Sequence, residues 1–422
     1  MWSYKTYLSI LLLGSLSLGS AAQVLNTAAP ATVKVSDSRL QRIDRVIQEN
    51  IDKGQIAGAV AFIARDGKVV YNKAFGYTDV ASKAPLRTDN IFRIASQTKA
   101  ITSVAAMILF EEGKLLLDDP VSKFIPSFSK PQVLDKFNPA DSSYTTVPAK
   151  REVTVRDLLT HTSGIDYAVI GSATGKAIYA KAGIPVGFER GGYSLQEAMD
   201  RLGRLPLAHQ PGERFTYGLN TDVLGRIVEV ASGTTLDKFF SERIFKPIGM
   251  NDTYFFLPPS KHARLVPIHT FDKENRLVKY ERNGVITADY PLSNGTYFSG
   301  GAGLSSTIAD YAAFLQMLLN GGTYNGKRIL ARRTVDLMTM NQIGDLSLRG
   351  NKFGLGFEIT TAQGEAKLGV SEGSFAWGGY FGTTYWVDPK EKVVALIYTQ
   401  QSPLRTDIQD KFRALVYQAI AD

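Results

Sequence analysis

The stretch FRIASQTKAITSVAAMILFEEGKL, residues 92–115, opens with a serine and a lysine three residues apart, Ser96 and Lys99. Apolar residues at helical spacing follow, which predicts a helix over Thr98–Glu112. Residues three apart share one helix face, so the serine hydroxyl and the lysine amine can meet. A serine at a helix start also lies among unpaired backbone N–H groups, which can stabilise an oxyanion. The pattern fits an activated nucleophile, and it also fits a capping serine beside a solvated lysine.

The composition is that of a globular protein with a large core. The chain has 422 residues, a formal net charge of +8 and 44% hydrophobic residues. Its basic residues form no block longer than a pair, such as Arg332-Arg333, whereas a nucleic-acid-binding face needs clustered charge. Cysteine is absent, which excludes disulfides and thiol chemistry. No histidine pair has the spacing of metal ligands, so we expect no metal and no other cofactor. Because the basic residues are scattered, we also expect no nucleic-acid partner.

The first residues, MWSYKTYLSILLLGSLSLGSAAQ, are typical of a secretory signal peptide. Lys5 precedes an apolar core, and small residues follow it, so we expect a signal over Met1–Ala22 that is cleaved after Ala22. The core is short for a membrane span, which needs about 20 apolar residues; an uncleaved anchor is the alternative. The mature protein is therefore expected to be periplasmic or secreted. Residues 23–37 are rich in Ala, Thr and Pro and are interpreted as a loose lead-in.

Both ends of the mature chain carry strand patterns. Near the N-terminus, an amphipathic helix over Ser38–Lys53 precedes two apolar runs that flank Asp66-Gly67, a strong hairpin signal. Near the C-terminus, residues 373–400 read as two or three strands with a turn at Asp388-Pro389-Lys390. An apolar stripe over Asp407–Ala419 then predicts a final helix.

The middle of the chain is mostly helical. The helices predicted there are Val155–Thr160, Leu195–Leu202, Asp222–Ala231, Leu236–Ile244 and Ile308–Leu319, and Ser127–Lys150 is expected to be irregular because of its prolines. Strands at both ends with helices between them predict an α/β (α+β) fold. We expect a central antiparallel sheet that is formed by both chain ends and flanked by helices. We expect one domain over 38–422, with a sheet subdomain at about 38–90 and 300–422 and an inserted helical subdomain at about 91–299.

Three motifs in order along the chain resemble those of the serine β-lactamase and penicillin-binding-protein superfamily. Ser96-Gln97-Thr98-Lys99 looks like the first. Tyr217, in the stretch GERFTYGLN before a predicted helix, looks like the second. Trp377-Gly378-Gly379, in the stretch FAWGGYFG, looks like the third. The resemblance runs from about residue 38 to the C-terminus, and it implies the β-lactamase/transpeptidase-like fold.

Departures from the lactamase motifs indicate the substrate. Class C β-lactamases carry an asparagine two residues after the tyrosine, where this chain has Leu219; Asn220, one residue later, is interpreted as a helix N-cap. Their third motif is Lys-Thr-Gly, where this chain has Trp377 and Gly378 in the first two positions. The lost charge-assisted hydrogen bonds favour uncharged, apolar acyl groups. The Trp-Gly-Gly variant is similar to family VIII carboxylesterases.

The resemblance implies a set of roles. Ser96 is the nucleophile, and Lys99 and Tyr217 form a coupled base; for this the amine has to be neutral, and burial and a cationic neighbourhood lower a lysine pKa in that direction. The backbone N–H groups of Ser96 and Tyr380 form the oxyanion hole. Trp377, Gly378 and Gly379 contact the substrate, and the glycines allow a close approach to the backbone.

Two other residues resemble catalytic groups. Ser371, in GVSEG, fits the nucleophile elbow of α/β-hydrolases, but strand-like sequence follows it and no histidine lies after it, so it is interpreted as a loop residue. His161 is interpreted as structural. We expect a carboxylesterase acting on a small-molecule ester. The alternatives are a β-lactamase or D-amino-acid peptidase acting on a β-lactam-like substrate, and a penicillin-binding or sensor protein that acylates and stalls.

Overall fold

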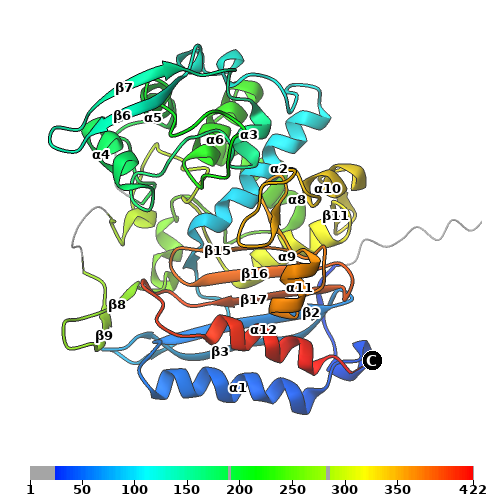
Figure 1. Ribbon diagram of the computed structural model, residues 1–422. Helices are drawn as coiled ribbons and strands as arrows, with labels where there is room; N and C mark the ends of the chain where they lie inside the picture. The colour runs from blue at the N-terminus through cyan, green and yellow to red at the C-terminus, as the bar shows by residue number, and fades with distance from the viewer. Residues whose placement is uncertain (1–23, 189–191, 282–285, 422) are drawn as a thin grey trace, which may run out of the picture.

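A large sheet with helices on both faces organises the molecule (Figure 1). The computed structural model describes residues 24–188, 192–281 and 286–421. Within these residues the sheet has nine strands, eight of them in the order β1-β3-β2-β17-β16-β15-β14-β13, with β4 paired to β3. Helices α1 (Asp37–Asp52) and α12 (Ile408–Ala419) pack together on one face. The expected signal peptide lies outside the described residues.

The two chain ends meet in the middle of the sheet. Strands β2 (Gly58–Arg65) and β3 (Lys68–Asp79) form the predicted hairpin, and the turn residues Asp66 and Gly67 have φ values of 49° and 70°. The last strand, β17 (Val393–Tyr398), pairs antiparallel with β2. Residues of β2 alternate between the two faces, so both faces carry a hydrophobic core. The predicted sheet of both chain ends, flanked by helices, is therefore confirmed.

The lead-in is ordered, contrary to the sequence-based expectation. Strand β1 (Asn26–Thr27) pairs with β3, and it runs parallel, which makes the sheet mixed rather than wholly antiparallel. A short helix, η1 (Pro30–Val33), and a bridge from Val35 to Ile420 follow. Both β1 side chains are exposed. Backbone pairing with an edge strand holds this segment, and such pairing leaves no apolar periodicity in the sequence.

The remaining strands and helices complete the described part of the chain. The shorter strands are β4 (Ala84–Pro85), β5 (Phe92–Arg93), β8 (His269–Phe271), β9 (Leu277–Lys279), β10 (Ser305–Ser306), β11 (Thr323–Tyr324), β12 (Lys327–Arg328), β13 (Lys352–Phe353), β14 (Glu358–Ile359), β15 (Phe375–Gly379) and β16 (Thr383–Asp388). The helices between α1 and α12 are α2 (Thr98–Glu111), α3 (Val155–Leu159), α4 (Ala173–Lys181), α5 (Leu195–Leu202), α6 (Asn220–Ser232), α7 (Leu236–Phe240), α8 (Lys246–Ile248), α9 (Ile308–Leu319), α10 (Arg332–Met338) and α11 (Ala362–Leu368).

The expected irregular stretch contains a hairpin instead. Strands β6 (Gln132–Asn138) and β7 (Ser143–Pro148) pair antiparallel at the far end of the helical region (Figure 1). Every residue of β7 is exposed. The hairpin has no buried face along β7, so the alternation that marks a half-buried strand is missing. Its prolines lie outside the paired positions or at the strand end, where a missing N–H does little harm.

Helix α2 joins the sheet to the helical region. It is buried along almost its whole length and packs against α6. A helix that is apolar all round belongs in the core. The short turn η2 (Ala95–Gln97) precedes it, and β15 packs against that turn. The start of α2 therefore lies where the sheet meets the helical region. None of the helices in the described ranges combines the length and apolar character that a membrane crossing requires.

Candidate active site

Ser96 opens into a cavity at the junction of sheet and helical region. The residue before it, Ala95, is fully buried and has a φ of 45°, in the left-handed region that residues with a side chain rarely adopt. This conformation turns the chain sharply before the serine. The Ser96 side chain, only partly buried, lines a cavity of about 520 Å³. The structure therefore presents the predicted nucleophile to a space of the size of a small-molecule site.

Lys99 lies beneath the serine and is 3% exposed. Its Nζ donates to the Gly301 carbonyl at 2.7 Å and to the Tyr167 hydroxyl at 3.2 Å. It lies 3.4 Å from Ser96 Oγ, which is a long hydrogen bond. The predicted pair is thus in contact, and Tyr167 joins it. No motif marked Tyr167 in the sequence, because only the fold brings it to the lysine.

Tyr217 completes the cluster. Lys99 Nζ lies 4.6 Å from the centre of the Tyr217 ring, and the Trp377 indole N–H donates to the Tyr217 hydroxyl at 3.3 Å. The tyrosine and tryptophan rings are 5.3 Å apart. The fold thus brings Ser96, Lys99, Tyr217 and Trp377 together from three distant parts of the sequence.

The protonation of Lys99 differs from the sequence-based expectation. Burial by itself lowers the pKa of the Lys99 amine, but the phenolic oxygens of Tyr167 and Tyr217 and the buried carboxylate of Asp222 outweigh it and raise that pKa. The expectation of a lowered lysine pKa is therefore wrong for this arrangement. Burial raises the pKa of Tyr167, which keeps that phenol neutral. The raised pKa favours the ammonium form of Lys99.

Asn220 and His161 lie behind Tyr217. Helix α6 begins at Asn220 without a side-chain cap, so the N-cap interpretation is wrong. The Asn220 amide instead donates to His161 Nδ1 at 2.9 Å and accepts a short hydrogen bond from Ser163 Oγ. The His161 ring packs 4.8 Å from the Tyr217 ring, and burial lowers the His161 pKa. A neutral His161 therefore supports Tyr217 by packing, as the structural interpretation expects.

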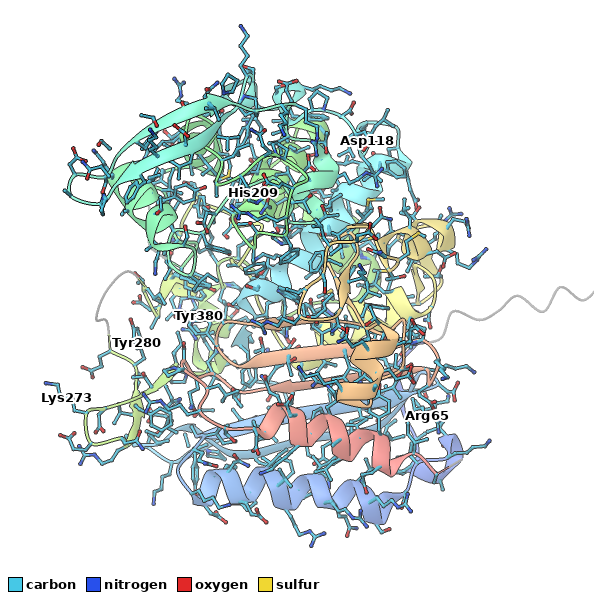
Figure 2. The ribbon with its side chains drawn as sticks, viewed as in Figure 1. Arg65, Asp118, His209, Lys273, Tyr280 and Tyr380 are labelled. Carbon is cyan, nitrogen blue, oxygen red and sulfur yellow. The ribbon has the colours of Figure 1, made fainter. Side chains whose placement is uncertain are left out.

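The third motif forms the end of β15. Gly378 and Tyr380 line the cavity, and Figure 2 labels Tyr380 at the junction of the sheet and the helical region. A Cβ at Gly379 would lie 2.5 Å from the Ile94 carbonyl oxygen. A Cβ at Gly378 would meet nothing closer than 3.5 Å. The need for glycine is therefore strict at Gly379 only, where the strand lies against the turn that carries Ser96.

The rim of the cavity includes charges that the motifs do not indicate. Arg349 and Glu358 line it from the segment before β15, and Gln409 and Arg413 line it from α12. Arg413 pairs with Asp410 at 3.0 Å. In contrast, Leu219 is fully buried and lies away from the cavity lining. The cavity lining therefore combines aromatic side chains with the cations of Arg349 and Arg413.

The other candidate groups lie elsewhere. Ser371 is in the loop between α11 and β15, where its N–H donates to Asp388, as the loop interpretation expects. Among the described residues, no group of three or more His, Cys, Asp or Glu side chains could hold a metal ion.

Comparison with known proteins identifies the family. The profile described as Beta-lactamase matches residues 43–419. The chain belongs to this family. It is 34% identical over 371 residues to Protein Rv1367c of Mycobacterium tuberculosis, with 85% of this chain and 89% of that protein covered. It is 31% identical over 373 residues to Esterase EstB of Burkholderia gladioli, with the same coverage.

Solved structures of this family have the same fold. EstCE1, described as a hydrolase with promiscuous acyltransferase activity, superposes with a TM-score of 0.79 at 28% identity. The match covers 90% of this chain and 98% of that one. The resemblance to β-lactamase-like proteins and family VIII esterases is therefore confirmed, and the chain belongs to a family of β-lactamase-fold hydrolases with esterase and acyltransferase relatives.

Proposed function

We propose that this protein is an exported serine carboxylesterase that cleaves short-chain carboxylic esters through an acyl-enzyme on Ser96. One observation carries the proposal: the Trp377 indole closes on the Tyr217 hydroxyl at 3.3 Å, beside the serine. An aromatic wall thus stands where the third lactamase motif has a lysine. This wall favours an uncharged acyl group, because the motif supplies no cation to pair with a charged one.

In the proposed first step, Ser96 Oγ attacks the ester carbonyl carbon. Its proton passes to the Lys99–Tyr217 pair, in which the ammonium of Lys99 stabilises a phenolate on Tyr217. The raised pKa of Lys99 supports this division of roles, because a protonated lysine cannot itself accept the proton. The carbonyl oxygen becomes an oxyanion, held by the backbone N–H groups of Ser96 and Tyr380.

The tetrahedral intermediate then collapses. The bond from carbon to the alkoxy oxygen breaks, and the Tyr217 proton is transferred to the leaving alcohol. Water attacks the acyl-enzyme next and gives its proton to the same pair. The bond between carbon and Ser96 Oγ breaks, the serine recovers its proton, and the carboxylic acid is released. No cofactor takes part in this scheme.

A second candidate is a β-lactamase or D-amino-acid peptidase. Arg349 and Arg413 on the rim favour it, because these guanidinium groups suit a substrate carboxylate. Neither arginine belongs to the three motifs, Arg413 is paired with Asp410, and Trp377 contacts the Tyr217 hydroxyl, so we rank the esterase first. Purified protein should be assayed on a short acyl ester and on a chromogenic cephalosporin. A kcat/KM for the cephalosporin equal to or above that for the ester would overturn the ranking.

The nucleophile is tested with a matched pair of serines. Ser96→Ala should abolish ester hydrolysis and covalent labelling by a phosphonate, whereas Ser371→Ala should keep most of the activity. The two serines have the same side chain but only Ser96 lines the cavity. A phosphonate found on Ser371 by peptide mass spectrometry would contradict the proposed mechanism.

Export is tested separately. The signal over Met1–Ala22 is expected to be removed, so intact mass of the protein from a secreting host should place the new N-terminus at Gln23. A mature chain that still begins at Met1 would contradict the proposed cleavage.

A further inference from the structure

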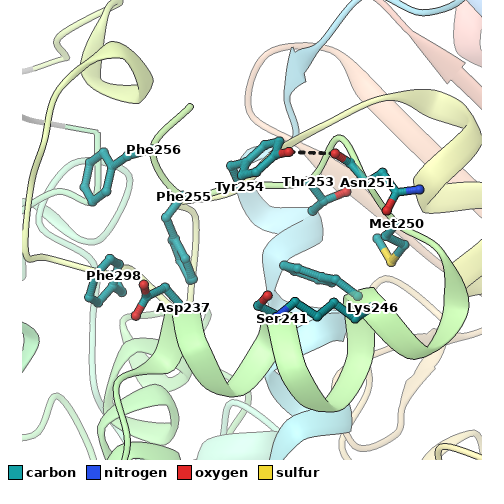
Figure 3. A pocket seen from close by; sticks show the side chains of 11 residues that line it. Asp237, Ser241, Lys246, Met250, Asn251, Thr253, Tyr254, Phe255, Phe256 and Phe298 are labelled. Carbon is teal, nitrogen blue, oxygen red and sulfur yellow. Dashed lines mark hydrogen bonds between the residues drawn. The ribbon is translucent and has the colours of Figure 1, made fainter. Parts of the chain in front are cut away.

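A second cavity lies between helix α7 and the segment that follows α8 (Figure 3). Its volume is about 390 Å³. Asp237, Ser241 and Phe245 line one side from α7 and the π-helical turn η5 (Ser241–Phe245). Phe255 and Phe298 line the other side. No residue of this cavity lines the cavity around Ser96, so the two sites are separate.

The Asp237 carboxylate is an unsatisfied group in this cavity. Its Oδ1 is sealed from solvent and has no hydrogen-bond partner among the described residues. Figure 3 shows the side chain pointing towards Phe255 and Phe298. Asp237 lies in the first turn of α7, where the helix dipole favours an acidic residue. The helix dipole explains why an acidic residue is favoured at this position. It does not supply the hydrogen bond that a buried carboxylate oxygen normally has.

The one cation among the residues that line this cavity does not neutralise Asp237. Lys246 lines the same cavity, but it is exposed and lies nine positions later. At about 1.5 Å per residue, their Cα atoms are separated by roughly 13 Å along the axis, too far for an ion pair. Asp237 therefore lines the cavity with no ion-pair partner among the described residues.

Three phenylalanines surround the space in front of this carboxylate. The rings of Phe255 and Phe298 have centroids 5.4 Å apart, and those of Phe256 and Phe298 are 5.9 Å apart. The faces of aromatic rings attract cations, and a carboxylate adds the counter-charge that a desolvated cation needs. We infer that this cavity binds a small organic cation, a protonated amine that carries an aryl or short alkyl group.

The inference is tested by titration calorimetry on the full mature chain with three probes of similar shape: 2-phenylethylammonium, 2-phenylethanol and 3-phenylpropionate. The ammonium should bind at least about 10-fold more tightly than the alcohol, because a desolvated charge pair adds to the apolar contact. The carboxylate should bind weakest. Equal binding of ammonium and alcohol would overturn the inference, as would tightest binding of the carboxylate.

Variants locate the site. Asp237→Asn keeps the shape of the side chain and removes the charge, so it should reduce ammonium binding to the level of the alcohol. Asp345→Asn, an exposed aspartate elsewhere, makes the same change in net charge and should leave binding unchanged. Phe298→Leu should weaken the binding of 2-phenylethylammonium about 10-fold, because it removes one aromatic ring. Thermal unfolding checks that each variant is folded. Unchanged ammonium binding in Asp237→Asn would overturn the inference.

Discussion

At the scale of single residues, the hydroxyl of Tyr167 is a positioning group for Lys99. It accepts a hydrogen bond from Lys99 Nζ at 3.2 Å and helps to raise the lysine pKa. Tyr167→Phe should lower kcat about 10-fold, less than the roughly 100-fold or more expected for a lost acid–base group, because Tyr167 only positions the lysine. Without the phenolic oxygen the ammonium is less favoured, so Lys99 deprotonates at lower pH. The alkaline limb of the pH profile should therefore move to lower pH.

The measurement is kcat/KM from about pH 6 to about pH 11 for wild type and Tyr167→Phe; the wild type should keep its activity at the alkaline end, because its lysine pKa is raised, and the variant should lose it. A variant that loses activity equally at every pH would show that the hydroxyl acts only through packing. Tyr179→Phe is the matched control, because its hydroxyl is also buried but accepts from the Asp166 backbone N–H. That variant should leave the alkaline limb in place.

The Trp377 indole N–H makes a second testable contact in the site. It donates to the Tyr217 hydroxyl at 3.3 Å. A neutral hydrogen bond contributes about 1 kcal/mol, so Trp377→Phe should lower kcat about fivefold and change KM little. Trp386→Phe is the control, since that indole donates to Tyr417 on the other face of the sheet. It should reduce thermal stability without reducing kcat. A fall in kcat of the same size in both variants would contradict the assigned role.

At the scale of elements, the fit of β15 against the turn η2 determines the geometry around Ser96. Gly379→Ala would bring a Cβ to 2.5 Å from the Ile94 carbonyl oxygen, so the strand has to move away from the serine. We expect kcat/KM to fall by at least about 100-fold, the scale of a lost oxyanion donor. Gly378→Ala makes only an ordinary van der Waals contact, 3.5 Å from the Thr383 carbonyl oxygen, and should retain activity within about 10-fold. A Gly379→Ala variant with wild-type kinetics would contradict this packing.

The elements that the sequence predicts best are those with a complete local signal. Asp66-Gly67 gives the hairpin of β2 and β3, and Leu195–Leu202 and Ile308–Leu319 have the predicted bounds. The hairpin of β6 and β7 was not predictable, because its exposed side chains carry no alternation.

The same limit applies to the site. Ser96, Lys99 and Tyr217 stand in motifs, and the structure brings them together. Tyr167 and Arg349 have no such context, and only tertiary packing brings them to the site and its rim. The protonation of Lys99 was also beyond the sequence, because it depends on which oxygens surround the amine.

At the scale of the whole molecule, buried histidines make stability depend on pH. His161, His209 and His269 are 1%, 3% and 1% exposed, and burial is the largest cause lowering the pKa of each. Below the ordinary histidine pKa of about 6.5, the unfolded chain binds protons that the folded chain does not. The free energy of unfolding is therefore highest above this value and falls as pH drops through it.

The slope is at most about 1.4 kcal/mol per pH unit for each histidine. Urea unfolding at pH 7.5, 6.5 and 5.5 measures how the free energy of unfolding depends on pH. His209→Gln should make this dependence shallower. Figure 2 shows His209 in the helical region, and His209 does not line the cavity around Ser96, so this variant tests stability apart from catalysis. A variant with the wild-type slope would contradict the prediction.

The pairing of β17 with β2 has a consequence for the order of events on the ribosome. The segment with Ser96 is made well before β15, β16 and β17. Until they emerge, β2 has no partner on that side, and β15 does not yet pack against the turn η2. Domains fold as units during synthesis only when their contacts are available. A nascent chain of this protein therefore carries its serine without the complete cavity until these strands have been made.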